Sequence, residues 1–179
     1  MRLFLYISIS FYFFISLLFA EETRQVDKHE HGVSELNIAI QSNTMVLEFM
    51  IPGADIVGFE YEAKSEQDKA TVNAALTKFD DYNNIFIIPI NSKCLLVSSK
   101  ININQEDDHD EHQEEAHNEF YAKYTFECGD IKSLDLLEFP YFETFSNYGE
   151  LEVQFVSEIG STSFEVEADS PIINIEGKI

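Results

Sequence analysis

Strict alternation of apolar and polar residues near the start of the chain is the feature that most constrains its fold. Leu36, Ile38 and Ile40 alternate with polar residues, and the same alternation resumes from Met45 to Ile51. Because successive side chains of a β-strand point to opposite faces, this pattern predicts two strands that each bury one face. The short polar break that starts at Ser42 predicts that the two strands form a hairpin.

Two more pairs of alternating runs follow. Residues 94–103 and 120–128 form the first pair, and residues 151–155 and 164–168 form the second, with a turn at Gly160. In the run from 94 to 103, we expect one face to carry Leu95, Val97, Ile101 and Ile103. An apolar run at 85–90 is interrupted by Pro89, so any strand there is short or lies at an edge.

One segment has helical spacing instead. Ser65 and Asp68 form a typical helix start. The apolar positions that follow at helical intervals are Val72, Ala75, Leu76 and Phe79. Another helical turn is expected within the aromatic stretch 134–145. We therefore predict an α+β fold, mainly antiparallel β-sheet of six or seven strands, with one main helix and a hairpin-tip loop rich in histidine and acidic residues.

The first 20 residues are almost entirely apolar. One basic residue precedes an uncharged run that ends at the small residue Ala20, which predicts a signal peptide cleaved before Glu21. An uncleaved membrane anchor is the alternative. The expected organisation is a signal peptide at 1–20, a mobile segment at 21–32 and a single β-rich domain at 33–179.

Export also accounts for the cysteines. Cys94 and Cys128 are the only two in the chain. An even pair in an oxidising compartment predicts one disulfide, which should stabilise the fold by about 3 to 4 kcal/mol. A metal-binding role for the pair is the weaker interpretation, because they lack CxxC spacing.

Acidic residues dominate the charge. The chain carries 33 Asp and Glu against 11 Lys and Arg, a formal net charge of −22. This charge repels nucleic acid and anionic lipid, so neither is expected as a partner, and no membrane contact is expected after signal cleavage.

All five histidines fall in two short segments. His29 and His31 lie just before the first strand, and the loop at 104–118 carries the other three among seven carboxylates. Imidazole and carboxylate together suit divalent transition metals, zinc first. The predicted metal ligands are His29, His31, His109, His112 and His117, supported by Asp110 and Glu114. A solvated acidic loop without metal is the alternative.

An enzyme is disfavoured. His109 and His112 are three residues apart, whereas zinc hydrolase motifs need histidines four apart on a helix. No nucleophile motif or glycine-rich phosphate loop is present in the sequence. Copper or nickel could replace zinc on this ligand set, and an acidic module that binds a cationic partner is a further alternative.

Six sequence blocks follow one another along the chain: HEHGVSELNIAI, IPGADIVGFEYEAKSEQD, CLLVSSKINI, YAKYTFEC, LEFPYFETF and LEVQFVSEIGSTSFEVEA. Together with the insert between the two cysteine-bearing strands, they resemble the ZrgA-like family of Gram-negative periplasmic zinc-binding proteins. The resemblance extends from about His29 to Ile175.

This resemblance implies a periplasmic protein that binds zinc when zinc is scarce. It further implies that the protein assists a high-affinity zinc ABC importer together with the solute-binding protein of that importer. The amino-terminal histidine motif of the family corresponds to His29 and His31 in this chain. The histidine-rich insert of the family corresponds to His109, His112 and His117. This chain departs from relatives in having a shorter, more acidic insert and Tyr61 where relatives commonly have histidine. Glu60 and Glu62 could compensate, although both are more typical of ordinary surface carboxylates.

Overall fold

The computed structural model describes residues 33–105, 118–147 and 149–179. The expected signal peptide at 1–20 and the expected segment at 21–32 therefore lie outside the described residues, as does the acidic insert between 106 and 117.

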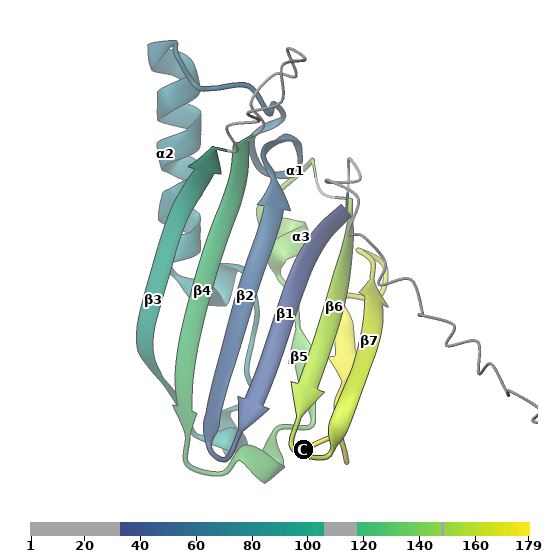
Figure 1. Cartoon of the computed structure of the whole chain (residues 1–179). Helices are drawn as coiled ribbons and strands as arrows, with labels where there is room; N and C mark the ends of the chain where they lie inside the picture. The colour runs from purple at the N-terminus through teal and green to yellow at the C-terminus, as the bar shows by residue number, and fades with distance from the viewer. Residues whose placement is uncertain (1–32, 106–117, 148) are drawn as a thin grey trace, which may run out of the picture.

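A six-stranded sheet organises the molecule (Figure 1). Its strand order across the sheet is β3-β4-β2-β1-β6-β7. The strands are β1 (Val33–Gln41), β2 (Thr44–Pro52), β3 (Cys94–Gln105), β4 (Asn118–Cys128), β6 (Glu150–Ser157) and β7 (Gly160–Val166). The three predicted hairpins are confirmed as β1–β2, β3–β4 and β6–β7.

The two halves of the sheet meet at a parallel pair. Ser34 of β1 lies beside Leu151 of β6, and both strands run in the same direction. The other four strand pairs of this sheet are antiparallel, which confirms a mainly antiparallel sheet. A separate antiparallel pair, β5 (Leu136–Glu138) and β8 (Ile172–Asn174), raises the number of strands in the described residues to eight.

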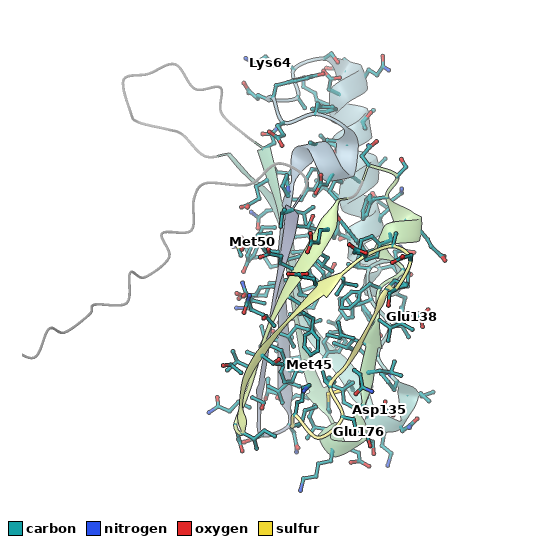
Figure 2. The ribbon with its side chains drawn as sticks, turned by 90° about the vertical axis from the view of Figure 1, so that its right-hand side faces the viewer. Met45, Met50, Lys64, Asp135, Glu138 and Glu176 are labelled. Atoms are coloured by element: carbon teal, nitrogen blue, oxygen red, sulfur yellow. A yellow bond between two sulfur atoms is a disulfide. The ribbon has the colours of Figure 1, made fainter. Side chains whose placement is uncertain are left out.

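One face of the main sheet is covered by a second layer. The side view shows the helices, β5 and β8 on the same side, with Glu138 and Asp135 on that layer (Figure 2). The helices are α1 (Gly53–Val57), α2 (Glu66–Asp80) and α3 (Tyr141–Thr144), with 3₁₀ turns at Tyr82–Asn84, Ile90–Ser92 and Ile131–Ser133. Among the described residues, no element covers the opposite face.

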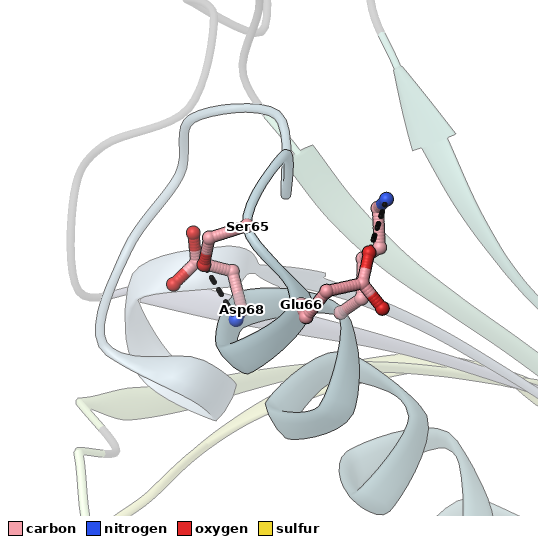
Figure 3. A network of polar contacts seen from close by, with 4 residues as sticks. Ser65, Glu66 and Asp68 are labelled. Carbon is pink, nitrogen blue, oxygen red and sulfur yellow. Dashed lines mark hydrogen bonds and ion pairs between the residues drawn. The ribbon is translucent and has the colours of Figure 1, made fainter.

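The main helix begins where the sequence predicts. Ser65 Oγ accepts a hydrogen bond from the Asp68 N–H at 3.0 Å, and Lys69 pairs with Glu66 at 3.1 Å (Figure 3). Val72, Ala75 and Phe79 are buried, as the helical spacing predicts, whereas Leu76 is half-buried. The cap satisfies a backbone donor that would otherwise lack a partner.

Aromatic rings fill the space between the two layers. Phe49 of β2 stacks on Phe86 with ring centroids 5.8 Å apart, and Phe79 of α2 stacks on Phe120 of β4 at 6.0 Å. All four rings are fully buried. Aromatic residues bury more area than any aliphatic residue, so these contacts fix the position of α2 against the sheet.

The prediction for the facing of β3 was wrong in part. Ile101 and Ile103 pair with the buried Ala122 and Phe120, but Leu95 pairs with Glu127 on the exposed face. A β-bulge between Leu96 and Ser98 inserts one residue. Since side chains alternate with a period of two, one extra residue reverses the facing of everything before it.

The apolar run at 85–90 forms no regular strand. Its one β-bridge is the isolated pairing of Ile87 with Glu138, which fits the interruption by Pro89. The last predicted strand is shorter than its alternating pattern suggested. β7 ends at Val166, and Ala168, which the pattern had placed in the strand, lies exposed beyond it. None of the helices in the described residues has the length and apolarity to span a membrane.

Candidate metal-binding end of the sheet

Both histidine-bearing segments attach to the same end of the main sheet. The segment with His29 and His31 precedes Val33, where β1 begins. The insert leaves β3 after Gln105 and re-enters at Asn118, where β4 begins. β1 and β4 run in the same direction, so both begin at the upper end in Figure 1.

The strand register gives the spacing between these attachment points. Glu35 of β1 is paired with Met50 of β2, and Pro52 of β2 is paired with Glu119 of β4. β1 and β4 therefore flank β2 at this end. Neighbouring strands lie about 4.8 Å apart, which separates the two attachment points by about 10 Å.

The predicted ligands themselves lie outside the described residues. This holds for all five histidines and for the supporting Asp110 and Glu114. Within residues 33–105, 118–147 and 149–179, no group of three or more His, Cys, Asp or Glu side chains is arranged to hold a metal ion.

Asn118 anchors the base of the insert. Its backbone N–H donates to the Glu60 carbonyl at 2.7 Å, and its side-chain Nδ2 donates to the Tyr61 carbonyl at 2.5 Å. The residue is 5% exposed, and its Oδ1 accepts no hydrogen bond within the described part of the chain. One residue thus fixes the start of β4 to the connection between α1 and α2.

Gly53 allows the same backbones to approach closely. A Cβ atom at this position would lie 2.6 Å from the Phe59 carbonyl oxygen and 2.9 Å from that of Asn118. Both distances are shorter than real Cβ contacts, so a larger residue would push the 59–61 connection away from β4. Glycine is therefore required here for space rather than for an unusual backbone angle.

A buried polar cluster lies below the start of β1. Ser34 Oγ donates to Asp55 Oδ2 at 3.0 Å and forms a second hydrogen bond with Tyr141 Oη at 3.1 Å. All three residues are buried. Burial raises the pKa of Tyr141 well above its ordinary value, and the charge of Asp55 adds to this rise while the bond with Ser34 opposes it. This cluster ties β1 to α1 and α3.

Carboxylates surround this end of the sheet. Glu119 lies at the start of β4, and Glu150, the first residue of β6, lies beside Val33. Glu62, considered above as a compensating ligand, forms an ion pair with Lys64 at 3.1 Å, and both side chains are more than half exposed. Tyr61 stacks on Phe59 with ring centroids 4.6 Å apart.

A surface pocket lies next to Asn118. It has a volume of about 390 Å³ and is bounded by α2, by the connection before α2 and by the ends of β3 and β4. Val72 and Ile103 give it an apolar floor, and Lys69 and Asn73 supply polar groups.

The predicted disulfide is confirmed. Cys94 and Cys128 are bonded, and they are direct partners at the opposite end of the β3–β4 hairpin from the insert. The hairpin that carries the insert is therefore fixed at both ends, by the disulfide at one and by Asn118 at the other.

Sequence reasoning missed Asn118, Gly53 and Asp55 as parts of this end. Their types are common in loops, and nothing in the local pattern indicates that they are buried. The one available signal was the placement of Asp55 and Gly53 in the block IPGADIVGFE, which the family resemblance had singled out as a unit.

Comparison with known proteins bears on the function of this end. A family model described as "ZrgA family zinc uptake protein" matches residues 28–175. No curated protein matches the chain. The matched range includes the whole sheet, both cysteines and the insert, which is far more than half of the sequence, and the family is one of zinc uptake rather than of enzymes. The chain therefore belongs to the ZrgA family of zinc uptake proteins.

Proposed function

We propose that this protein captures zinc in the periplasm of a Gram-negative cell and assists a high-affinity zinc ABC importer, together with the solute-binding protein of that importer. Membership of a zinc uptake family supports the proposal. The observation that carries it is the sheet topology, which joins both histidine-bearing segments to one end of the sheet.

The proposed zinc ligands are imidazoles from both segments, and carboxylates of the insert support them. They are His29, His31, His109, His112 and His117, with Asp110 and Glu114. Nitrogen and oxygen donors of this kind form the usual zinc ligand set. No catalytic residue is assigned, because the proposed role is binding and delivery.

We further propose that ligands from the two segments hold one ion in common. His31 stands two residues before Val33, and His117 stands immediately before Asn118. The two attachment points are about 10 Å apart across β2. Consecutive Cα atoms are 3.8 Å apart, so these two histidines start within a few residue lengths of one another.

The proposed compartment follows from the same set of features. Residues 1–20 act as a signal peptide, which leaves 21–32 as the N-terminal segment of the mature chain ahead of the domain at 33–179. The bonded cysteines fit an oxidising compartment such as the periplasm.

Zinc titration at two pH values tests histidine ligation. Imidazole must be neutral to bind a metal, and its pKa is about 6.5, so the zinc affinity of the mature chain should be high at pH 7.5 and much lower at pH 5.5. The measurement is calorimetric titration of the mature chain, in competition with copper and nickel to establish which metal is preferred. Equal zinc affinity at the two pH values would refute histidine ligation.

Substitutions distinguish zinc ligation by the histidines from simple attraction of zinc by the negative charge of the chain. Replacing His109, His112 and His117 by Ala should lower the number of zinc ions bound, and replacing His29 and His31 should weaken the shared ion. The matched control is Glu152→Gln with Glu165→Gln, which removes two neighbouring carboxylates from the sheet face and leaves every histidine in place. If the control loses as much zinc as the histidine variants, charge alone binds the metal.

Growth under zinc limitation tests the link to the importer. Cells that lack this protein should grow poorly in zinc-depleted medium, and the wild-type chain should restore growth while the loop histidine variant should not. Added zinc should remove the difference. Equal growth with and without the protein in depleted medium would exclude a role in high-affinity import while leaving zinc binding intact.

A further inference from the structure

One carboxylate is buried at the end of the sheet to which the histidine segments attach. Asp55 of α1 is 3% exposed, and it is the only Asp or Glu of the described residues that is buried. α1 follows directly on β2, whose end lies beside the start of β1, so α1 is at the upper end of the sheet in Figure 1. Burying a carboxylate is costly unless hydrogen-bond donors or a cation compensate for the lost water. Its burial therefore needs partners that offset this cost.

The contacts of Asp55 show which way protons are donated in this cluster. Ser34 Oγ donates to Asp55 Oδ2 at 3.0 Å. Because the single hydroxyl proton of Ser34 is used there, the 3.1 Å hydrogen bond between Ser34 Oγ and Tyr141 Oη is donated by the tyrosine. Both hydroxyl protons thus point toward the carboxylate. An ionised carboxylate offers about four acceptor positions, so Asp55 can accept from Ser34 and from other donors at the same time.

The length of the chain limits how far the nearer N-terminal histidine can lie from this cluster. His31 precedes Ser34 by three residues. An extended chain spans at most about 3.6 Å per residue, so the two Cα atoms lie within about 11 Å of one another on any path. Gly32 stands between His31 and β1, and glycine allows backbone turns that other residues rarely adopt. The imidazole of His31 can therefore reach the side of the sheet on which Asp55 lies.

We infer that Asp55 is a positioning residue for the N-terminal zinc ligands. Its carboxylate accepts a hydrogen bond from one ring nitrogen of His31, and the other ring nitrogen binds zinc. This inference rests on the proposed zinc function. A carboxylate in this role fixes the tautomer and the orientation of the imidazole and makes the ligating nitrogen more basic. Its negative charge also partly offsets the charge of the ion.

Tight fixing distinguishes Asp55 from the other carboxylates at this end. Glu119 and Glu150 are half-buried, and Glu62 is more than half exposed and pairs with Lys64. A side chain that faces water samples several rotamers and has its charge screened by salt, so it holds an imidazole poorly. Asp55 is short, buried and bonded to the first turn of β1, which keeps its carboxylate in one place.

Zinc affinity and fold stability, measured separately on the mature chain, test the role of Asp55. Asp55→Asn keeps the shape of the side chain and an oxygen for Ser34 but removes the charge. Calorimetric titration near neutral pH should show a zinc dissociation constant about tenfold to a hundredfold higher than that of the wild type. The matched control is Tyr141→Phe, which removes a hydroxyl from the same cluster and should leave the dissociation constant unchanged. Urea denaturation in EDTA measures how much each variant changes the metal-free fold.

A double-mutant cycle connects the effect to His31. In a His31→Ala chain, Asp55→Asn should change the zinc dissociation constant little further, because the imidazole that it positions is already absent. An equal loss of affinity in the two backgrounds would mean that the carboxylate acts on zinc only as a distant charge, which overturns the inference.

NMR of the wild-type chain gives a readout that does not depend on the folding of any Asp55 variant. In the zinc-loaded, ¹⁵N-labelled protein, the ring N–H of His31 should give a proton signal that exchanges slowly with water, because a buried acceptor holds it. The His31→Ala chain identifies this signal by its loss. A loaded wild-type chain without such a signal contradicts the inference.

The outcomes separate this inference from the proposed function. Zinc binding by Asp55→Asn that equals that of the wild type, or a loss as large in Tyr141→Phe, overturns the role of Asp55 and leaves the zinc function intact. A wild-type chain that binds no zinc overturns the proposed function and this inference together.

Discussion

Individual polar side chains determine where the histidine insert is attached. Asn118 joins β4 to the connection before α2 through two hydrogen bonds, and Gly53 gives the space for this contact. The Ser65 cap was predictable because a capping pattern is local in sequence. The burial of Asn118 was not, because it depends on a connection more than fifty residues earlier in the chain.

Replacing Asn118 by Ala should lower the free energy of unfolding by about 0.5 to 1.5 kcal/mol, because the hydrogen bond from the buried Asn118 side chain to the Tyr61 carbonyl is lost. Urea denaturation followed by circular dichroism measures the change. Asn73→Ala, in the same pocket but at an exposed position, is the control and should change stability by less than about 0.5 kcal/mol. Equal effects of the two substitutions would show that the Asn118 contacts contribute nothing specific.

At the scale of elements, the β3–β4 hairpin illustrates what alternation can and cannot predict. Both strands and their pairing were predicted, because a period of two is visible in the sequence. The bulge at Val97 was not, because one inserted residue leaves the composition of the run unchanged and only reverses which side chains face the core. The apolar residues that seemed to belong to the core, Leu95 and Val97, are in fact exposed.

Removing the disulfide with Cys94→Ser and Cys128→Ser should lower the free energy of unfolding by about 2 to 5 kcal/mol, because the unfolded chain regains the freedom of a long closed loop. The two cysteines are 34 positions apart. Urea denaturation with and without reductant measures the change: the wild-type midpoint should fall on reduction, and that of the double variant should not move. Overlapping curves for the wild type and the double variant would contradict the prediction.

For the molecule as a whole, topology rather than local pattern brings the two histidine segments to one end. The sequence predicted hairpins, one main helix and the candidate ligands. It did not predict the parallel pairing of β1 with β6, because the partner strands are separated by most of the chain and no local residue pattern specifies which strand a given strand will join. Nor did it predict that β4 joins β2, and the common attachment end of the segments depends on that pairing, because β2 is antiparallel to both β1 and β4.

Stability should decline at alkaline pH because of two buried tyrosines. Burial raises the pKa of Tyr124, and Asp80 and Asp81 raise it further; burial likewise raises the pKa of Tyr141. Below about pH 10 both hydroxyls are protonated in the folded and in the unfolded chain, so the two tyrosines do not change the free energy of unfolding with pH. Above it only the unfolded chain ionises, and each tyrosine should cost up to about 1.4 kcal/mol per pH unit.

Urea denaturation at a series of pH values, with the absorbance of tyrosinate as a second signal, measures this decline. Tyr124→Phe removes one of the two groups and should make the decline shallower, although it also removes the hydrogen bond to the Phe79 carbonyl and lowers stability at neutral pH. A slope that is unchanged in the variant would show that Tyr124 ionises freely in the folded protein.

The central position of β1 has a consequence for how the chain is made. β1 is the first strand to emerge during synthesis, yet one of its edges is completed only when β6 arrives, near the other end of the sequence. Until then β1 exposes apolar side chains and an open backbone edge to any neighbouring unfolded chain. A newly made copy therefore stays open to wrong pairing with neighbouring chains until β6, at residues 150–157 of 179, has been made.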